Sequence, residues 1–284
     1  MISGFYINLD RNPERRVKIE SELAKGGLTG YARFAACDGN VFGFPNPVLT
    51  NGEMGCFSSH YALLKQNEKQ PHHIHHVEDD VIFAPCAKQV IDWMINTGKL
   101  KEYDIIYTDV AVPLLNDAMR AYKAFYDVIV KRDVNGGIHS SAFAVLDMRE
   151  LSFASTCSFL VRAESIGKLR ELFEKELQAG TQYPVDLFIR KLCQGGVIRV
   201  GCLFPFISSI PPESCLSSTM EPRFDELSAL APNIVRHSFF VGRDLATCRD
   251  LVTKFLPSPD TGDEHMRLLL DLLAYSMNRD YKKN

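Results

Sequence analysis

The sequence predicts an α/β protein, a mixed sheet with helices on both of its faces. Short apolar runs recur along the chain with helical patterns between them, and the runs lack the strict alternation of half-exposed strands. Several of the runs end in a carboxylate. With 284 residues, of which 46% are hydrophobic and 24% charged, the chain can bury a sizeable core. In open α/β sheets, ligands bind beyond the carboxyl ends of the strands, so the polar residues there are the first candidates for a site.

The first predicted elements form a β-α unit. The run Gly4–Leu9 predicts a strand, and Asn12 followed by Pro13 predicts the start of a helix over residues 13–26. Gly26 and Gly27 end that helix. The stretch Asp38–Gly55 is rich in Gly, Pro and Asn, which predicts a long loop of the kind that often carries function.

The middle of the chain continues the alternation. Phe57, Tyr61 and Leu64 have helical spacing up to Pro71. The runs 74–83 and 104–108 predict two further strands, each ending in or beside acidic residues. More strands are expected at residues 142–146, 157–161 and 196–203, with a helix at 164–177 and antiparallel pairing within 137–153.

The chain divides into two predicted regions. Residues 1–222 form the main α/β domain. Residues 223–284 form a helical extension that packs on it, with Leu268, Leu269, Leu272 and Leu273 as the apolar seam of its last helix.

The composition argues against several function classes. Lys and Arg number 32 against 35 Asp and Glu, so the net charge of -3 offers no field that attracts nucleic acid. No signal peptide and no run of about 18 apolar residues is evident, so we expect a cytoplasmic protein. The eight cysteines form no C-x-x-C pair, which favours reduced and mostly buried thiols.

The stretch HHIHHVEDDVIF, residues 72–83, combines histidines with acids and suggests a metal site. Asp79 and Asp80 end one strand, and Asp10 and Asp109 end two others, so these carboxylates can converge on one rim of the sheet. Mg²⁺ and Mn²⁺ prefer such hard oxygen ligands together with substrate phosphates. The histidines alternate between the two faces of the strand, and no third ligand has a recognisable zinc spacing. We therefore expect the acids to bind the metal and the histidines to pack and form hydrogen bonds.

Five segments in order resemble glycosyltransferase family 25, which contains bacterial lipooligosaccharide galactosyltransferases and collagen galactosyltransferases. They are FYINLDRNPERR, AACDGN, LTNGEMGCFSSHYALLK, HHVEDDVIF and YPVDLF, within residues 5–188. The resemblance implies a GT-A-type, Rossmann-like fold, a UDP-sugar donor and Mn²⁺ or Mg²⁺ held by the acidic motif Glu78, Asp79 and Asp80. Two departures, the histidine-rich strand before the acids and Cys37 where valine is common, leave the acids untouched.

The resemblance assigns roles to the acids. Asp80 is the first choice as a direct metal ligand, with Asp79 on the donor ribose or on the metal through water. Asp186, in YPVDLF, matches the second acidic motif and is the candidate catalytic base, although a helix-capping role is an alternative. Asp109 is the rival base.

Further residues are candidates for binding the donor. Asn8, Asp10 and Arg11 end the first strand, where the nucleotide is gripped in GT-A enzymes, although they could instead cap the following helix. Asp38 could contact uridine or ribose, with Gly39 in a turn of positive φ. Glu53 and His60 could face the donor, or could satisfy loop amides and pack in the core.

The most consistent reading is an inverting, metal-dependent transferase that moves a hexose, galactose by family likeness, from UDP to a glycan or glycolipid acceptor such as lipooligosaccharide. A lipid-linked acceptor would place it at the inner face of the membrane, where Tyr281, Lys282 and Lys283 could make peripheral contact. A metal-dependent phosphohydrolase and a catalytically silent sugar-binding module are the alternatives. The sequence names neither the acceptor, the exact UDP-hexose nor the oligomeric state.

Overall fold

The computed structural model describes residues 1–42, 46–130, 143–211, 214, 226–244, 246–248 and 250. Residues Met1–Arg243 form one compact unit, and every helix and strand named below belongs to it. The predicted seam Leu268–Leu273 and the basic end Tyr281–Lys283 lie outside the described residues. The division of the chain at residue 222 stays a prediction.

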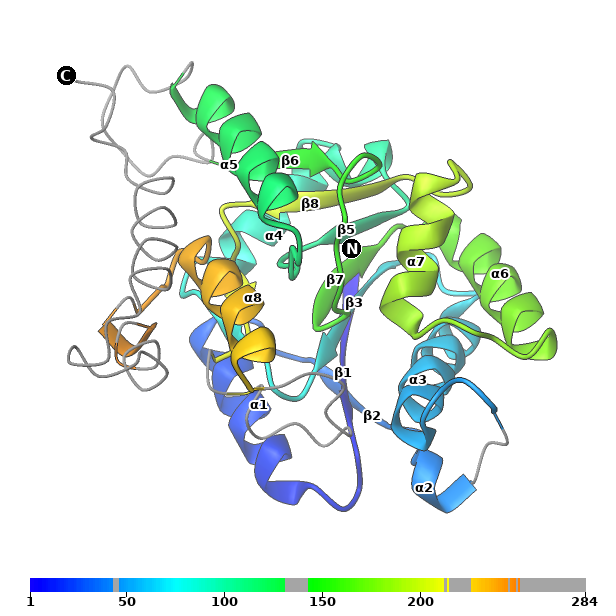
Figure 1. Cartoon of the computed structure of the whole chain (residues 1–284). Coiled ribbons are helices and arrows are strands. Elements are labelled where there is room, and N and C mark those ends of the chain that lie inside the picture. The colour runs from blue at the N-terminus through cyan, green and yellow to red at the C-terminus, as the bar shows by residue number, and fades with distance from the viewer. Residues whose placement is uncertain are drawn as a thin grey trace. The chain divides into compact units, whose positions relative to one another are not determined.

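The centre of the fold is a seven-stranded mixed sheet with the order β2-β1-β3-β7-β5-β8-β6 (Figure 1). Hydrogen-bond pairing sets β2, β1, β3, β5 and β8 in one direction and β7 and β6 in the other. A short ribbon of β4 (Ile82–Phe83) and β9 (Ser208–Ser209) lies outside this sheet. The strands of the sheet are β1 (Ile2–Asn8), β2 (Ala32–Ala35), β3 (His73–Glu78), β5 (Ile105–Tyr107), β6 (Ala144–Asp147), β7 (Ser158–Val161) and β8 (Val200–Phe204).

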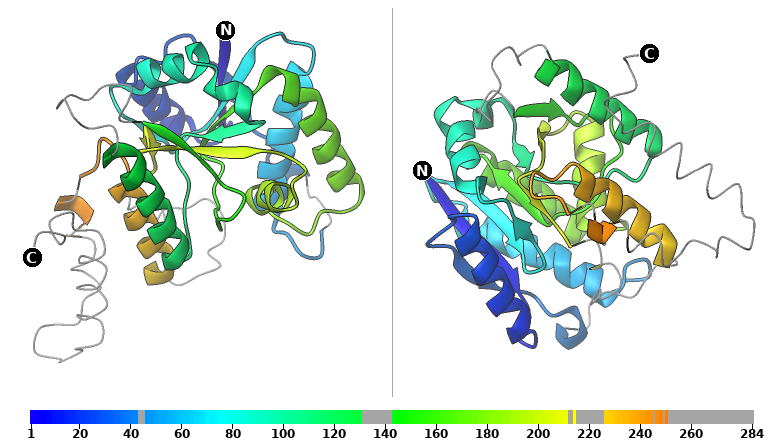
Figure 2. Two further views of the ribbon diagram at one scale, coloured as in Figure 1. Left: turned by 90° about the horizontal axis from the view of Figure 1, so that it is seen from above. Right: turned by 90° about the vertical axis from the view of Figure 1, so that its left-hand side faces the viewer.

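Helices cover both faces of the sheet, as predicted. Helices α1 (Pro13–Lys25) and α4 (Ala87–Asn96) pack on one face. Helices α3 (Asn51–Asn67), α6 (Ile166–Gln178) and α7 (Val185–Gln194) pack on the other, and Figures 1 and 2 show the two layers. The remaining elements are α2 (Gly39–Phe42), α5 (Leu115–Val130), α8 (Glu226–Ser238) and the 3₁₀ turns Lys99–Glu102 and Ala163–Ser165. The predicted α/β class is confirmed.

Strand β3 explains why the apolar runs lack alternation. Ile74 packs into the core cluster with Phe57 and Phe173, while Val77, on the opposite face, packs with Ile19 and Met94. Because both faces of the strand are covered, apolar side chains are required on both. The predicted division of this strand's residues between two faces is therefore confirmed.

Two predicted boundaries were wrong. The expected loop 38–55 contains helix α2 and the start of α3. Thr50 and Glu53 form a capping box that begins α3 at Asn51, a signal stronger than the glycines around it. The expected strand 74–83 is also interrupted, because a turn at Asp79–Asp80 separates β3 from β4.

Gly39 is required for close packing and not for a positive φ, which corrects the prediction for this residue. It is absent from the glycines with positive φ. A Cβ atom on Gly39 would lie 1.7 Å from the carbonyl oxygen of Asn51, and one on Gly55 would lie 2.6 Å from that of Cys37. The segment after β2 therefore packs directly on the first turns of α3.

The described part of the chain also bears on two other expectations, the state of the cysteines and the presence of a membrane-spanning helix. The seven cysteines within the described residues are all free, and four of them are buried. Among the same residues, no helix has both the length and the apolar character needed to cross a bilayer.

Candidate functional site

The direction of the strands brings the predicted acids to one edge of the sheet. The carboxyl ends of β1, β3 and β5 lie at this edge together with the first residue of the antiparallel strand β7. Asn8, Glu78 and Ser158 are the residues at these strand ends, and Asp109 follows β5. The structure therefore brings residues at several strand ends to one edge of the sheet, as the sequence argument expected.

Asp79 and Asp80, in the turn after β3, share one cation. Arg15 of α1 places its guanidinium 2.7 Å from Oδ1 of Asp79 and 2.9 Å from Oδ2 of Asp80. Asn8 donates a hydrogen bond of 2.7 Å from its side-chain amide to Oδ2 of Asp79. Both oxygens of Asp79 are thus occupied, and Asn8 and Arg15 hold its carboxylate in place.

Asp80 differs from Asp79 because only one of its two carboxylate oxygens is bonded within the described residues. Its Oδ1 atom is buried and has no hydrogen-bond partner among the described residues. Burial and the nearby charge of Glu78 raise the pKa of Asp80 to about 6, against the lowering effect of Arg15. An unpartnered carboxylate oxygen beside other acids is suited to binding a divalent cation, so the residues fit the metal that the acidic motif implies.

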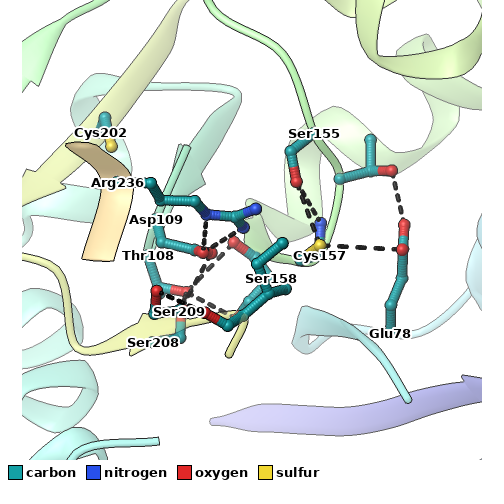
Figure 3. Close-up of polar contacts among 12 residues, drawn as sticks. Glu78, Thr108, Asp109, Ser155, Cys157, Ser158, Cys202, Ser208, Ser209 and Arg236 are labelled. Atoms are coloured by element: carbon teal, nitrogen blue, oxygen red, sulfur yellow. Dashed lines mark hydrogen bonds and ion pairs between the residues drawn. The ribbon is translucent and has the colours of Figure 1, made fainter. Parts of the chain in front are cut away.

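Glu78 lies between two groups of potential ligands. Thr156 donates a hydrogen bond of 2.6 Å to Oε1, and the Nε2 atom of His60 lies 3.3 Å from the same oxygen. The thiol of Cys157 contacts Oε2 at 3.9 Å, as Figure 3 shows. Although burial raises the pKa of Glu78, hydrogen bonds from His60 and Thr156 bring it below its ordinary value. Glu78 therefore stays ionised at neutral pH.

Two sets of three side chains could hold a metal ion within the described part of the chain. Glu78, Asp80 and Cys157 form one set, and Cys56, His60 and Glu78 form the other. In each set the ligand atoms lie within 4.8 Å of one another. The predicted acidic site is therefore next to thiols and an imidazole that the sequence analysis did not assign to a metal.

The strand histidines pack and form hydrogen bonds, as expected. His75 is fully buried and bonds the hydroxyls of Tyr31 at 2.6 Å and Ser158 at 2.8 Å. His73 accepts a hydrogen bond of 3.0 Å from the amide of Ala163. His76 stacks on His60 with an angle of 3° between the rings.

Asp109, the rival base, is the centre of a buried ion pair. Arg236 of α8 donates to its Oδ2 atom, and Ser208 donates a hydrogen bond of 3.0 Å to Oδ1 (Figure 3). The side chains of Arg236 and Asp109 are 1% and 0% exposed. Burial raises the pKa of Asp109, while Arg236 and Ser208 oppose that shift. Both oxygens of Asp109 are engaged, and no motif in the sequence pointed to Arg236.

The ion pair of Asp109 continues into a chain of hydroxyls. Thr108 lies 2.7 Å from Ser208 and donates a hydrogen bond of 2.6 Å to Ser158, which bonds His75 in turn. We name His75, Ser158, Thr108, Ser208, Asp109 and Arg236 the buried network.

Asp186 lies in the first turn of α7 and accepts two backbone hydrogen bonds. Oδ1 accepts from the amide of Leu187 at 2.8 Å, and Oδ2 accepts from the amide of Ser155 at 2.9 Å. Burial raises the pKa of Asp186, against these two amides. Ser155 has a φ of 86°, a strained value for a residue other than glycine, and such strain is frequent at functional sites.

The other predicted donor-binding residues lie in pairs. Asp10, whose side chain is 82% exposed, pairs with Arg33, and Arg11 pairs with Asp38. Arg33 also donates to the side-chain oxygen of Asn8 at 3.0 Å, so these pairs extend from the end of β1. Glu53 caps α3 through the backbone amide of Thr50, in agreement with its alternative structural role.

Comparisons with known proteins identify the family of the chain. A family profile described as "Glycosyltransferase family 25 (LPS biosynthesis protein)" matches residues 1–189. A protein of Drosophila melanogaster named "Glycosyltransferase 25 family member" is 32% identical over 123 residues, covering 36% of this chain and 20% of that protein. A protein of the same name from Aedes aegypti is 29% identical over 126 residues, with the same coverage. The chain spans about a fifth of the length of these relatives.

Among solved structures, the galactosyltransferase LgtC in complex with donor and acceptor sugar analogues matches with a TM-score of 0.38. The match has 13% sequence identity and covers 82% of this chain and 83% of that chain. An active-site mutant of LgtC matches with a TM-score of 0.39 and 12% identity.

Proposed function

The chain belongs to glycosyltransferase family 25, and on that premise we propose that it transfers a hexose, galactose in the first instance, from UDP to a hydroxyl of a glycan acceptor with inversion of the anomeric carbon. Lipooligosaccharide is the acceptor class that we propose. A lipid-linked acceptor of this kind would place the reaction at the cytoplasmic face of the membrane.

The observation that carries the proposal is the unpartnered oxygen of Asp80, a residue that lies with Glu78 in a group of possible metal ligands. Asp80 would bind Mn²⁺ or Mg²⁺ directly with Glu78 beside it, and Asp79, whose oxygens are both bonded, would reach the metal through water. A bound divalent cation would neutralise the negative charge that develops on the diphosphate leaving group.

Arg15 and Asn8 support the same acids. Asn8 fixes the carboxylate of Asp79, and Arg15 neutralises Asp79 and Asp80. We propose that Arg15, which is partly exposed, pairs with a phosphate oxygen of the donor when a metal takes over the neutralisation of Asp80.

Asp186 is our candidate for the base. It would accept the proton of the acceptor hydroxyl while the hydroxyl oxygen attacks the anomeric carbon and UDP leaves with the bonding electrons. Its raised pKa makes it a stronger base than an exposed aspartate. The alternative base, Asp109, is less suited because it is fully buried and paired with the cation of Arg236, whereas Asp186 is partly exposed and bonds only to backbone amides.

The test is UDP release from a panel of UDP-sugars, measured with Mn²⁺ and after chelation. Donor hydrolysis without the true acceptor is the readout, so the acceptor need not be known. We expect one UDP-hexose to be turned over only with metal and the variant Asp80→Ala to lose that activity by about 1000-fold, since a metal contributes several kcal/mol. Asp92→Ala, a change at a partly exposed carboxylate of α4 that pairs with Lys88, is the control. Full activity in Asp80→Ala would refute the assigned metal site.

A further inference from the structure

Cys56 and His60 form a group of possible ligands with Glu78, and neither Cys56 nor His60 has a role in the proposed transfer reaction. Cys56 and His60 are four residues apart on α3, so their side chains lie on the same face of the helix. Glu78, at the end of β3, lies opposite them. One ligand atom from each residue lies within 4.8 Å of the other two.

The hydrogen bonding of His60 suits a metal ligand. Its Nδ1 atom lies 3.2 Å from Nδ1 of His76, which is fully buried. Without a metal, Nε2 of His60 donates to Glu78; with a metal bound, the ring proton would lie on Nδ1 and be donated to His76, which would leave the lone pair of Nε2 for the ion. Ligating histidines use their second nitrogen in this way, because that bond sets the tautomer and orients the ring.

The distance between His60 and Glu78 is long for a strong hydrogen bond. Nε2 lies 3.3 Å from Oε1 of Glu78, whereas charge-assisted hydrogen bonds between nitrogen and oxygen are about 2.7–2.9 Å. The oxygen receives its short bond of 2.6 Å from Thr156 instead. The direct contact between His60 and Glu78 is therefore a long hydrogen bond, and a cation bound by both Nε2 and a carboxylate oxygen would replace it.

The ligand types differ from those of the acidic motif. Thiolate, imidazole and carboxylate are the ligands of zinc, whereas Mn²⁺ and Mg²⁺ prefer oxygen alone. Glu78 belongs to both groups, since it also lies within 4.8 Å of Asp80 and Cys157 in the other set. An ion bound by Cys56 and His60 would therefore compete for an oxygen of the acidic motif.

We propose that Cys56, His60 and Glu78 form a zinc site that shares only Glu78 with the proposed Mn²⁺ site, and that zinc bound there inhibits the transferase by occupying Glu78. Zinc binding converts the Cys56 thiol to a thiolate and releases its proton to solvent. The inhibition rests on the proposed function, whereas the zinc site itself does not.

The first measurement is metal binding by the reduced, metal-free full chain. Cobalt serves as a coloured substitute for zinc, and we expect a thiolate-to-cobalt absorption band that zinc abolishes by displacement. Cys56→Ser should remove this band, and His60→Gln should weaken zinc binding by more than about tenfold, because loss of even a supporting residue costs about 10- to 100-fold. Cys86→Ser, which changes a partly buried thiol outside the group, is the matched control and should leave binding unchanged.

A measurement on the wild type tests the zinc site without relying on the folding of any variant. Zinc should protect Cys56 from alkylation, mapped by mass spectrometry, and leave the alkylation of Cys86 unaltered. No zinc binding, or a cobalt band that persists in Cys56→Ser and disappears in Cys157→Ser, would overturn the proposal.

The inhibition is tested separately. Zinc should suppress Mn²⁺-dependent UDP release by the wild type and should do so at least about tenfold less potently in Cys56→Ser. Asp80→Asn should retain Cys56-dependent zinc binding while losing UDP release. If zinc binds as expected but no UDP-sugar is turned over, the proposed function fails and the zinc site stands. Equal inhibition of the wild type and Cys56→Ser would overturn the inhibitory role.

Discussion

The acidic turn after β3 and the buried network after β5 both contain aspartates, but they differ in how many carboxylate oxygens are bonded. Asp80 keeps a buried oxygen without a partner and shares Arg15 with Asp79 near the surface. Asp109 has both oxygens bonded and its partner Arg236 is 1% exposed. Both aspartates follow strands that end at the same edge of the sheet. An acid at a strand end is thus available to a ligand only where the surrounding side chains leave its oxygens free.

The largest effect is expected from breaking the buried ion pair. Arg236→Met leaves Asp109 buried without its cation, which should lower the free energy of unfolding by about 3–5 kcal/mol. Urea denaturation of the full chain measures the change. The double variant Asp109→Leu with Arg236→Met should lose less than Arg236→Met alone, because it buries no unpaired charge. A loss below about 1 kcal/mol in Arg236→Met would show that the network does not stabilise the fold.

A second prediction separates the two candidate bases. Asp186→Asn should lower kcat by about 100-fold or more, the usual range for a general base, and leave KM for the donor nearly unchanged. Asp92→Asn, at a partly exposed carboxylate of α4, is the matched control. An Asp186→Asn variant of normal kcat, together with a folded Asp109→Asn variant that is inactive, would assign the base to Asp109 instead.

The sequence could identify the acidic turn but not the buried network. Strand ends and the acidic motif predicted the position of Asp79 and Asp80 because these follow from local order along the chain. Arg236 is 127 residues from Asp109, and nothing near it in the sequence marks it as the partner of a buried acid. Such a pair depends on tertiary packing, which local patterns do not report.

Other differences between prediction and structure have local causes. The capping box of Thr50 and Glu53 is recognisable in the sequence, but the glycines around it favour a loop over the helix start that the structure contains. Strand β2 escaped prediction because it is a four-residue edge strand with no buried residue. The pairing of Cys56 with His60 and Glu78 also required the structure, since α3 and β3 meet only in the folded chain.

A third prediction concerns the far end of the buried network. Burial lowers the pKa of His75 to about 3. An unfolded histidine takes up its proton near pH 6.5, so between these values the unfolded state binds more protons and stability falls as the pH falls, by up to about 1.4 kcal/mol per pH unit. Wild type should therefore lose about 2 kcal/mol more than His75→Gln between pH 7 and pH 5.

Urea denaturation at the two pH values measures this difference. Gln has no titrating group but can still bond the hydroxyls of Tyr31 and Ser158, so the pH dependence and not the absolute stability is the readout. If the free energy of unfolding fell equally in the wild type and in His75→Gln between the two pH values, His75 would be protonated in the folded protein, contrary to its position in the network.

The smallest effect on stability is expected for Arg15, the arginine that pairs with Asp79 and Asp80. Arg15→Met makes the same chemical change as Arg236→Met, but the pairs of Arg15 with Asp79 and Asp80 are partly exposed, and such pairs are worth about 0–1 kcal/mol. Asp79 also keeps its hydrogen bond from Asn8. The free energy of unfolding should therefore change by less than about 1 kcal/mol, while KM for the UDP-sugar rises because a phosphate partner is lost. If Arg15→Met destabilised the protein as much as Arg236→Met, the acidic turn would be a second structural ion pair, and its oxygens would not be free for a metal.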